Sequence, residues 1–381
     1  MNSAWTEKRV LLRVLNFFRP CMITFLWNHT GANSFGEKMK LGIIGLQGAG
    51  KSTIFEALTR QDTSSGHRGE NLVGTVTVPD YRVDLLKKMY NPKKTVYAQV
   101  AYLLPGVSNK NDGNSDQKTI IGIRDSDAFI HVIRNFSRFG AKEPEPYNDF
   151  KKTDQEFILS DLIVIEKRLE RLGLDKKRGK KVDPKEIDLL NQCKENLEAE
   201  IPLRKVPELA QAHLLRGYAF LSAKPVLVLF NNEDENDNIP HIDKLTDIEK
   251  CMVIKGKLEQ ELAYMSEEEA KEFLLEFNIT SSAMDRVIKM SYQLLGLISF
   301  FTVGEDEVKA WTIKKDIPAM DAAGEIHSDI KKGFIRAEVL AYDDLIDAGT
   351  YNEARKKGTV RLEGKTYIVA DGDIINFRFN V

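Results

Sequence analysis

From residue 39 onward, short apolar segments that are typical of strands alternate with segments that have a helical pattern. The first apolar segment starts at Leu41 and leads through a glycine-rich turn into the helical sequence KSTIFEALTR. Further strand-like segments cover residues 72–79, 96–105, 129–133, 226–230 and 251–255. Helical segments cover residues 120–128, 258–277 and 281–296. This alternation predicts an α/β fold, in which helices cover both faces of a parallel sheet.

A helical pattern of a different kind interrupts the alternation in the middle of the chain. In residues 153–173, apolar side chains recur at spacings of four, three, four and three, which is a heptad seam. They are Ile158, Leu162, Ile165, Leu169 and Leu172. We expect this helix to stop at Gly173, and Asp183 and Pro184 to begin a second helix that ends at Pro202. Together they predict an antiparallel helical arm.

The loop between these two predicted helices is strongly basic. Residues 175–181 read DKKRGKK and contain five basic side chains among seven residues. They are Lys176, Lys177, Arg178, Lys180 and Lys181. Two interpretations stay open: a turn that is merely solvated, or the tip of a projecting arm that meets a phosphate backbone.

Residues 300–381 show a third pattern, with several strand-like segments around one helical segment. Such a mixture predicts a small, separate α+β domain. The predicted parts of the chain are a leader (1–38), an α/β domain in two pieces (39–140 and 223–299), the arm (141–222) and the small domain (300–381).

The composition of the chain excludes few classes of function. Hydrophobic residues make up 42% of the chain, charged residues 29%, and the net charge is −2. This ordinary balance gives no global attraction to nucleic acid or membranes. The three cysteines, Cys21, Cys193 and Cys251, are far apart and lack metal-ligand spacing, which fits a reducing compartment, the cytoplasm.

The leader does not resemble the rest of the chain. Its apolar sequence is broken by Arg13, Arg19 and Pro20, and the longest uncharged run is too short to span a bilayer. We expect the leader to be disordered and the folded chain to begin at Met39. A presequence of the mitochondrial type is the alternative, because basic residues outnumber acidic ones there.

The most specific motif follows the first predicted strand. The pattern G-x-x-x-x-G-K-S, formed by Gly45, Gly50, Lys51 and Ser52, is the Walker A signature of phosphate-binding loops. Glycines let backbone N–H groups approach phosphate oxygens, and the following helix directs its positive end at the same phosphates. Lys51 would reach the β- and γ-phosphates, and the Ser52 hydroxyl would ligate Mg²⁺. The predicted nucleotide-binding residues here are Gly45, Gln47, Gly48, Ala49, Gly50, Lys51, Ser52 and Thr53.

Three stretches of the chain resemble the YchF/Obg-like ATPase family of translation-associated P-loop NTPases. They are MKLGIIGLQGAGKSTIFEALTR at residues 39–60, the start of the arm at residues 149–172, and the sequence from residue 299 to the C-terminus. The resemblance implies a Ras-like NTPase core, an inserted coiled-coil arm and a C-terminal TGS domain with a ubiquitin-like β-grasp fold. It also implies association with ribosomes and a preference for ATP over GTP.

Several positions depart from the pattern of this family. Its Asp-x-x-Gly switch uses the Asp to hold the water shell of Mg²⁺, but the matching segment here begins with Leu103, which cannot ligate a metal. We therefore expect Mg²⁺ to rest on Ser52, phosphates and water, with a weaker effect on binding than usual. In the first switch region, Arg68 stands near the position of the γ-phosphate-sensing Thr. Val107 falls where Ras-like enzymes carry the water-orienting Gln, a position at which the family already has an apolar residue. No catalytic base is visible.

These departures leave two functions open. The first is a purine-nucleotide-binding NTPase that hydrolyses ATP or GTP slowly. The alternative is a nucleotide-binding interaction protein whose switch regions have lost the chemistry of hydrolysis.

The contact with the nucleotide base is predicted in the loop after residues 226–230. This loop reads Asn231-Asn232-Glu233-Asp234, where GTPases carry Asn-Lys-x-Asp and the ATP-preferring members of the family end in Glu. Asp234 could accept from guanine, but the missing Lys removes packing over the base, and the resemblance favours ATP. A polar loop without base contact is a further alternative. Asn231 and Asp234 complete the predicted site.

The predicted macromolecular partner is the ribosome or RNA, bound through the arm tip and the TGS domain. Four basic residues of that domain would face RNA, or else form a solvated surface: Lys331, Lys332, Arg336 and Arg361. His327 fits a surface or capping role better than a catalytic one. No membrane partner and no recognition of a DNA sequence are expected.

Overall fold

The structure is a computed structural model that describes residues 39–63, 69–106, 122–138, 140, 142–240, 249–276 and 282–380. The predictions for the leader at residues 1–38, for Arg68 and for Val107 lie outside these residues. The described residues belong to one compact unit of the chain, Glu37–Val381.

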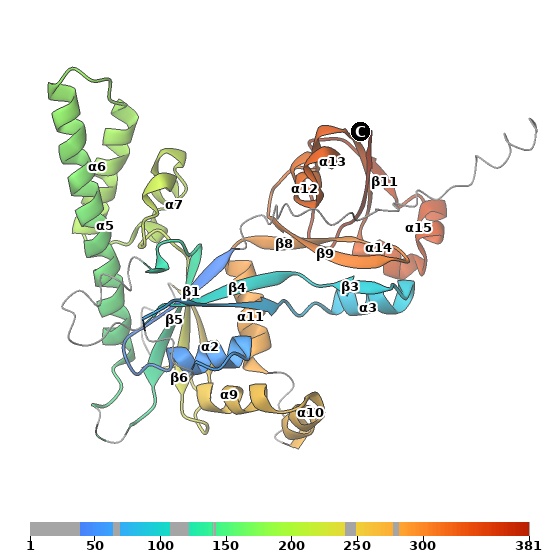
Figure 1. The fold of residues 1–381 in the computed structure, drawn as a ribbon, viewed down its shortest axis with the longest axis horizontal. Coiled ribbons are helices and arrows are strands. Elements are labelled where there is room, and N and C mark those ends of the chain that lie inside the picture. Colours follow the sequence, from blue (N-terminus) through green and yellow to red (C-terminus); the bar gives the residue numbers. More distant parts are fainter. Residues whose placement is uncertain are drawn as a thin grey trace, which may run out of the picture. The chain divides into compact units, whose positions relative to one another are not determined.

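The first sheet has six strands in the order β2-β4-β1-β5-β6-β7 (Figure 1). They are β1 (Lys40–Ile44), β2 (Leu72–Thr77), β4 (Gln99–Leu104), β5 (Ala128–Asn135), β6 (Val226–Asn232) and β7 (Lys250–Ile254). Only the edge strand β2 runs antiparallel to its neighbour, and the other pairs are parallel. The prediction of an α/β fold is therefore confirmed. The carboxyl ends of the parallel strands share one edge, where ligands of such sheets usually bind.

Helices pack on both faces of this sheet because its central strands are apolar on both sides. On one face, Leu41 and Ile43 of β1 share an apolar cluster with side chains of α2 and α11. On the other face, Ile44 shares a cluster with Phe150 and Phe157 of α5. The helices in this part of the chain are α2 (Lys51–Thr59), α3 (Tyr81–Tyr90), α5 (Pro146–Lys177), α9 (Gly256–Tyr264), α10 (Glu267–Glu276) and α11 (Ala283–Leu294).

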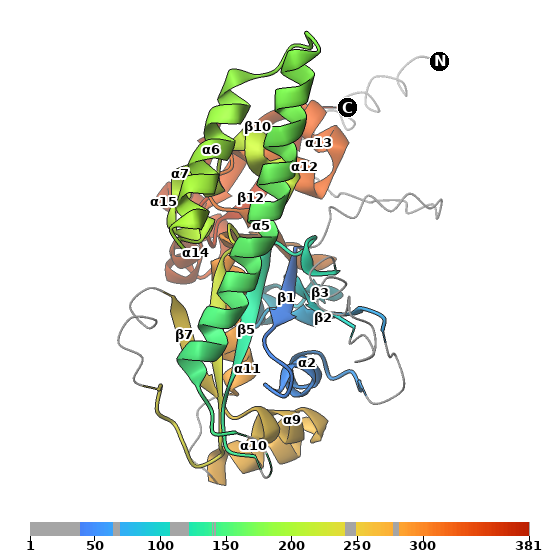
Figure 2. The ribbon, with the colours of Figure 1, turned by 90° about the vertical axis from the view of Figure 1, so that its left-hand side faces the viewer.

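The arm consists of α5 and α6 (Pro184–Glu198), which lie side by side in Figures 1 and 2. All five predicted seam residues belong to one apolar cluster with Leu190, Cys193 and Leu197 of α6. The Asp183 carboxylate caps α6 by accepting a hydrogen bond from Lys185 N at 2.9 Å, as its sequence predicts. Three short helices follow: η1 (Leu203–Lys205), α7 (Pro207–Ala210) and η2 (His213–Tyr218).

Some predicted boundaries are wrong. Helix α5 continues through Gly173 to Lys177, because this glycine is exposed and keeps a helical backbone, and Gly179 makes the turn instead with a φ of +77°. Helix α6 ends at Glu198, before Pro202. The predicted strand 96–105 is divided between two sheets, and of the predicted helix 120–128 only residues 122 and 123 are helical in the described part.

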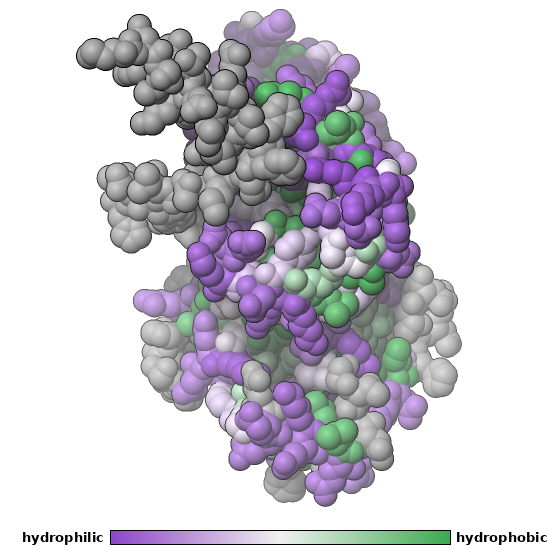
Figure 3. All heavy atoms as spheres, turned by 90° about the vertical axis from the view of Figure 1, so that its right-hand side faces the viewer, coloured by the Kyte–Doolittle hydropathy of each residue, from purple (hydrophilic) through white to green (hydrophobic). Residues whose placement is uncertain are grey.

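The second sheet has the order β11-β10-β12-β8-β9-β3. Its strands are β3 (Lys94–Val96), β8 (Leu297–Thr302), β9 (Glu307–Lys314), β10 (Phe334–Leu340), β11 (Arg361–Glu363) and β12 (Ile374–Phe379). Helices α12 (Ala319–Ile326) and α13 (Ser328–Lys332) share an apolar core with one face of the sheet, and α14 (Tyr342–Ala348) and α15 (Tyr351–Lys357) follow β10. Figure 3 shows the side on which α15 lies in Figure 1, where most of the described residues in view are hydrophilic.

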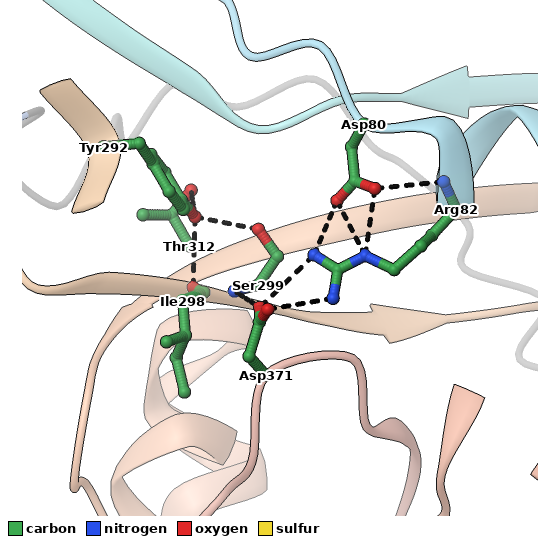
Figure 4. A network of polar contacts seen from close by, with 7 residues as sticks. All are labelled: Asp80, Arg82, Tyr292, Ile298, Ser299, Thr312 and Asp371. Carbon is green, nitrogen blue, oxygen red and sulfur yellow. Dashed lines mark hydrogen bonds and ion pairs between the residues drawn. The ribbon is translucent and has the colours of Figure 1, made fainter. Parts of the chain in front are cut away.

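Strand β3 connects the two halves of the chain, because it comes from the first half and pairs in parallel with β9. Arg82 at the start of α3 strengthens this connection (Figure 4). Its guanidinium donates to Asp80 at 2.8 Å and to Asp371 at 2.9 Å, and the Asp371 carboxylate also accepts from Ser299 N of β8 at 2.9 Å. The ring of Phe301 lies 5.1 Å from the guanidinium carbon. Among the described helices, none combines the length and the apolar character needed to cross a membrane.

Arg82 is expected to stabilise this connection far more than an exposed ion pair does. Arg82→Ala leaves the largely buried Asp80 carboxylate without its partner, which should lower the free energy of unfolding by about 2–4 kcal/mol. Lys93 is the matched control, because its 2.8 Å ion pair with Asp306 joins the same parts of the chain but is exposed. Lys93→Ala should cost much less than Arg82→Ala, because water screens an exposed ion pair. Urea denaturation measures both values, and equal losses would contradict this account.

Candidate functional site

The loop between β1 and α2 lies at the carboxyl edge of the first sheet. Gly45, Gly48 and Gly50 have φ values of +136°, +83° and +99°, which residues with a side chain rarely adopt. A Cβ atom at Gly45 would also collide with the carbonyl oxygen of Val132 on β5. The glycines of the motif are therefore needed for the path of this loop.

Helix α2 begins directly after the loop, at Lys51. Its N-cap residue is Gly50, so no side chain occupies the N–H groups of the first turn. These groups and the helix dipole make the end of α2 suited to an anion. The Ser52 hydroxyl stands exposed on the same turn, Thr53 is half-buried, and Gln47 and Gly48 are exposed in the loop.

The Lys51 side chain folds back across the loop. Its Nζ donates to the carbonyl oxygens of Gly45 at 2.8 Å and Leu46 at 2.9 Å. Burial lowers the pKa of Lys51 from its ordinary value. The ammonium group therefore lies at the phosphate loop with protein carbonyls as its partners, where a phosphate would be a stronger one.

Asn231, at the end of β6, links the phosphate loop to the start of α9 by hydrogen bonds. Its Nδ2 donates to the carbonyl oxygen of Ala49 at 3.1 Å, and its Oδ1 accepts from Gly256 N at 2.9 Å. The side chain is buried, and a Cβ atom at Gly50 or Gly256 would collide with it. The structure thus places Asn231 against the protein backbone, a bracing role that the sequence motif alone did not reveal.

The loop after Asn231 is held in shape by its own side chains. Asn232 Nδ2 donates to the carbonyl oxygens of Asn236 and Asn238, each at 2.9 Å. Glu233 accepts from Ser137 N at 2.8 Å, which ties the loop to the end of β5. Asp234 is exposed. Of the two residues predicted for the base site, Asn231 is therefore used to brace the phosphate loop, and Asp234 has no partner among the described residues.

Leu103 is buried at the end of β4, in the apolar cluster that contains Ile44 and Phe129. No metal ligand can come from this position, and a carboxylate introduced there would be costly to bury. Among the described residues, no group of His, Cys, Asp and Glu side chains could hold a metal ion by itself. Among the described residues of this loop, Ser52 carries the side-chain oxygen suited to ligate Mg²⁺.

His131 of β5 is a buried neighbour of the loop that no sequence motif pointed to. Its ring stacks on Phe150 with centroids 5.4 Å apart, and its Cδ2 would lie 3.6 Å from a Cβ atom at Gly45. Burial lowers the pKa of His131 to about 3, with further contributions from Arg204 and Lys51. The imidazole is therefore neutral near pH 7 and adds no charge to the phosphate loop.

The predicted partner surfaces differ in how strongly their charges are paired. At the arm tip, Lys180 pairs with Asp175 at 2.7 Å, and the other four basic side chains are exposed. In the C-terminal part, Lys331 and Lys332 have carboxylate partners, whereas Arg336 lies opposite Arg378 in the β10–β12 register. His327 caps α13 by accepting from Asp329 N at 3.1 Å, which confirms its predicted role.

The chain is similar to known proteins over most of its length. A family model named YchF-GTPase_C, with the description "Protein of unknown function (DUF933)", matches residues 297–380. The "Ribosome-binding ATPase YchF" of Bacillus subtilis (strain 168) is 40% identical over 363 residues, which cover 89% of this chain and 99% of that protein. The protein of the same name from Haemophilus ducreyi is 37% identical over 362 residues, covering 90% and 99%. The solved "Structure of the Schizosaccharomyces pombe YchF GTPase" has a TM-score of 0.76 and 28% identity, and the match covers 92% of this chain and 99% of that one.

Proposed function

Because the chain belongs to the YchF family, we propose that it is a purine-nucleotide-binding P-loop NTPase that works at the ribosome. The observation that carries this proposal is the loop between β1 and α2, with its three glycines at positive φ and Lys51 across its mouth. In this proposal, residues 39–140 and 223–299 are the NTPase core, residues 141–222 the arm, and residues 300–381 the TGS domain. Work at the ribosome would place the protein in the cytoplasm.

Different groups of the loop would contact different parts of a bound triphosphate. The N–H groups of the loop and of the first turn of α2 would hold the phosphate oxygens, and Lys51 would exchange its carbonyl partners for the terminal phosphates. When bound, Mg²⁺ neutralises phosphate charge, and Ser52 is the protein ligand that fits it. Its contribution should be smaller than in NTPases with an acidic switch residue, because Leu103 supplies no carboxylate.

Hydrolysis is proposed to be slow. The bacterial relatives are named ATPases, and the phosphate loop of this chain is intact, so a non-hydrolysing protein is the less favoured alternative. No described side chain at the end of β4 offers a base or a metal ligand, which argues against fast turnover.

The proposed nucleotide is ATP, with GTP as the alternative. Two bacterial relatives are named ATPases, whereas the solved yeast structure is titled a GTPase. Asp234 is the exposed group in the predicted base loop, and its carboxylate could accept from a guanine. A competition between ATP and GTP for the same loop decides the base.

Lys51→Ala tests the site. The change removes the charge-assisted contact to the phosphates, worth about 1.5–3 kcal/mol, so ATP should bind about 10- to 100-fold more weakly. Isothermal titration at fixed Mg²⁺ measures the affinity. Lys88→Ala is the control, because Lys88 is exposed on α3, away from the loop. Unchanged ATP affinity in Lys51→Ala would refute the assignment. Single-turnover hydrolysis by the unaltered protein then separates a slow enzyme from a mere binder.

The arm tip is the proposed contact with ribosomal RNA. Four exposed basic side chains surround the turn at Gly179, and α5 and α6 pack along a continuous apolar seam. Such a tip can reach phosphates at a distance from the NTPase core. The surface of the TGS domain around Arg336 and Arg378 is the second candidate contact.

Replacing Lys177, Arg178 and Lys181 by Ala should weaken ribosome binding and flatten its salt dependence. Each lost phosphate contact should reduce the slope of log affinity against log salt by about one. Lys180 is kept because it pairs with Asp175. Co-sedimentation with ribosomes at several salt concentrations measures the slope.

The matched control for the arm tip removes three other exposed lysines, Lys87, Lys88 and Lys257. This variant loses the same net charge and should keep the slope of the unaltered protein. If both variants behave alike, the tip is a solvated turn and the surface near Arg336 becomes the candidate. ATP affinity should stay unchanged in both.

A further inference from the structure

Gly106 leaves the first sheet beside the phosphate loop. Strands β1 and β4 are parallel neighbours, and Gly42 lies opposite Leu103. Gly45 and Gly106 each follow three residues later, so both chains leave adjacent strands at the same carboxyl edge. The Gly106 N–H is therefore a backbone donor at the end of the strand next to β1, which leads into the loop that is proposed to hold phosphates.

The Gly106 N–H is engaged by the side chain of Asn71, which directly precedes β2. Asn71 Oδ1 accepts from Gly106 N at 3.0 Å. The chains cross tightly here: a Cβ atom at Gly106 would lie 2.5 Å from the carbonyl carbon of Gly69, and one at Gly122 would lie 3.0 Å from Asn71 Nδ2. The Asn71 amide is thus confined between two glycines, and its oxygen is aimed at a single donor.

The order of the strands says which end of a nucleotide would come near Gly106. The loop with Asp234 follows β6, the phosphate loop follows β1, and Gly106 follows β4, in the spatial order β4-β1-β5-β6. A nucleotide with its base near Asp234 and its phosphates on the β1 loop therefore extends its last phosphate toward β4. A nucleoside diphosphate lacks this last phosphate and would not reach Gly106.

We propose that Asn71 sets the preference between triphosphate and diphosphate, by competing with the terminal phosphate for the Gly106 N–H. This inference rests on the proposed function, since it names a further residue of the same site. One backbone N–H makes one good hydrogen bond, so a terminal phosphate must displace the Asn71 oxygen. Asn71 is thus a positioning residue that lowers triphosphate affinity and leaves diphosphate affinity unchanged.

Removing the competing oxygen tests the proposal. In Asn71→Ala, the non-hydrolysable β,γ-imido analogue of ATP should bind about two- to tenfold more tightly, the value of one neutral hydrogen bond, while ADP binds as before. Asn376→Ala is the matched control, because Asn376 is exposed on β12 in the second sheet. Isothermal titration with both nucleotides gives the ratio of the two dissociation constants.

If Asn71 had only a structural role, Asn71→Ala would change the affinities for the ATP analogue and for ADP together, and the ratio of the two dissociation constants would stay the same. An unchanged ratio would therefore overturn the inference. Weaker binding of the triphosphate analogue would overturn it as well. If the unaltered protein binds neither nucleotide, the proposed function fails and this inference fails with it. If the unaltered protein binds both nucleotides and Asn71→Ala leaves the ratio of their dissociation constants unchanged, this inference fails while the proposed function stands.

A second measurement uses the unaltered chain and so does not depend on the folding of a variant. Pro105–Gly106 is the only Pro-Gly pair in the sequence. Labelling proline with ¹³C at the carbonyl and glycine with ¹⁵N therefore gives one amide signal in a carbonyl-correlated NMR spectrum, that of Gly106. We expect this signal to move with the triphosphate analogue and not with ADP. Equal shifts with both, or none with either at saturation, would contradict the exchange of partners.

Discussion

The buried side chain of Asn231 is the interaction on which the candidate site depends. Its amide makes one hydrogen bond to the phosphate loop, at Ala49, and one to the start of α9, at Gly256. Both ends of a buried amide must be paired, since each unpaired group costs about 1–3 kcal/mol. The pairing is possible only because Gly50 and Gly256 leave room for the amide. The loop, β6 and α9 are thereby held as one rigid element, and Lys51 is presented from it.

The sequence predicted those parts of the structure whose cause is local. The positive φ angles of Gly45, Gly48 and Gly50 are a property of glycine, and the heptad seam of α5 is a property of helical spacing. Three features depend on distant segments and could not be predicted: the pairing of β3 with β9, the two contacts of Asn231, and the contact of Asn71 with Gly106. The predicted stop at Gly173 was wrong because an exposed glycine costs a long, well-packed helix only about 1 kcal/mol.

Strand β2 links the nucleotide site to the C-terminal sheet. Asn71 precedes it at one end, and Asp80 with Arg82 follows it at the other, where Arg82 reaches Asp371. Strand β3, which follows α3 in the chain, pairs with β9 of the second sheet. A shift of Asn71 that follows from phosphate binding would therefore be passed along a single strand to the contact with the C-terminal sheet. A ligand can shift the equilibrium between two positions of such a strand only by the difference between its affinities for them.

The central claim is that the loop between β1 and α2 binds a purine nucleoside triphosphate with little help from a metal. Titration of the unaltered protein with ATP, once with Mg²⁺ and once with a chelator, tests it most directly. The account predicts binding at one site in both conditions, with Mg²⁺ strengthening it only modestly, because Leu103 supplies no carboxylate. Absence of binding in both conditions would contradict the claim, and binding that requires Mg²⁺ would show that another group holds the metal.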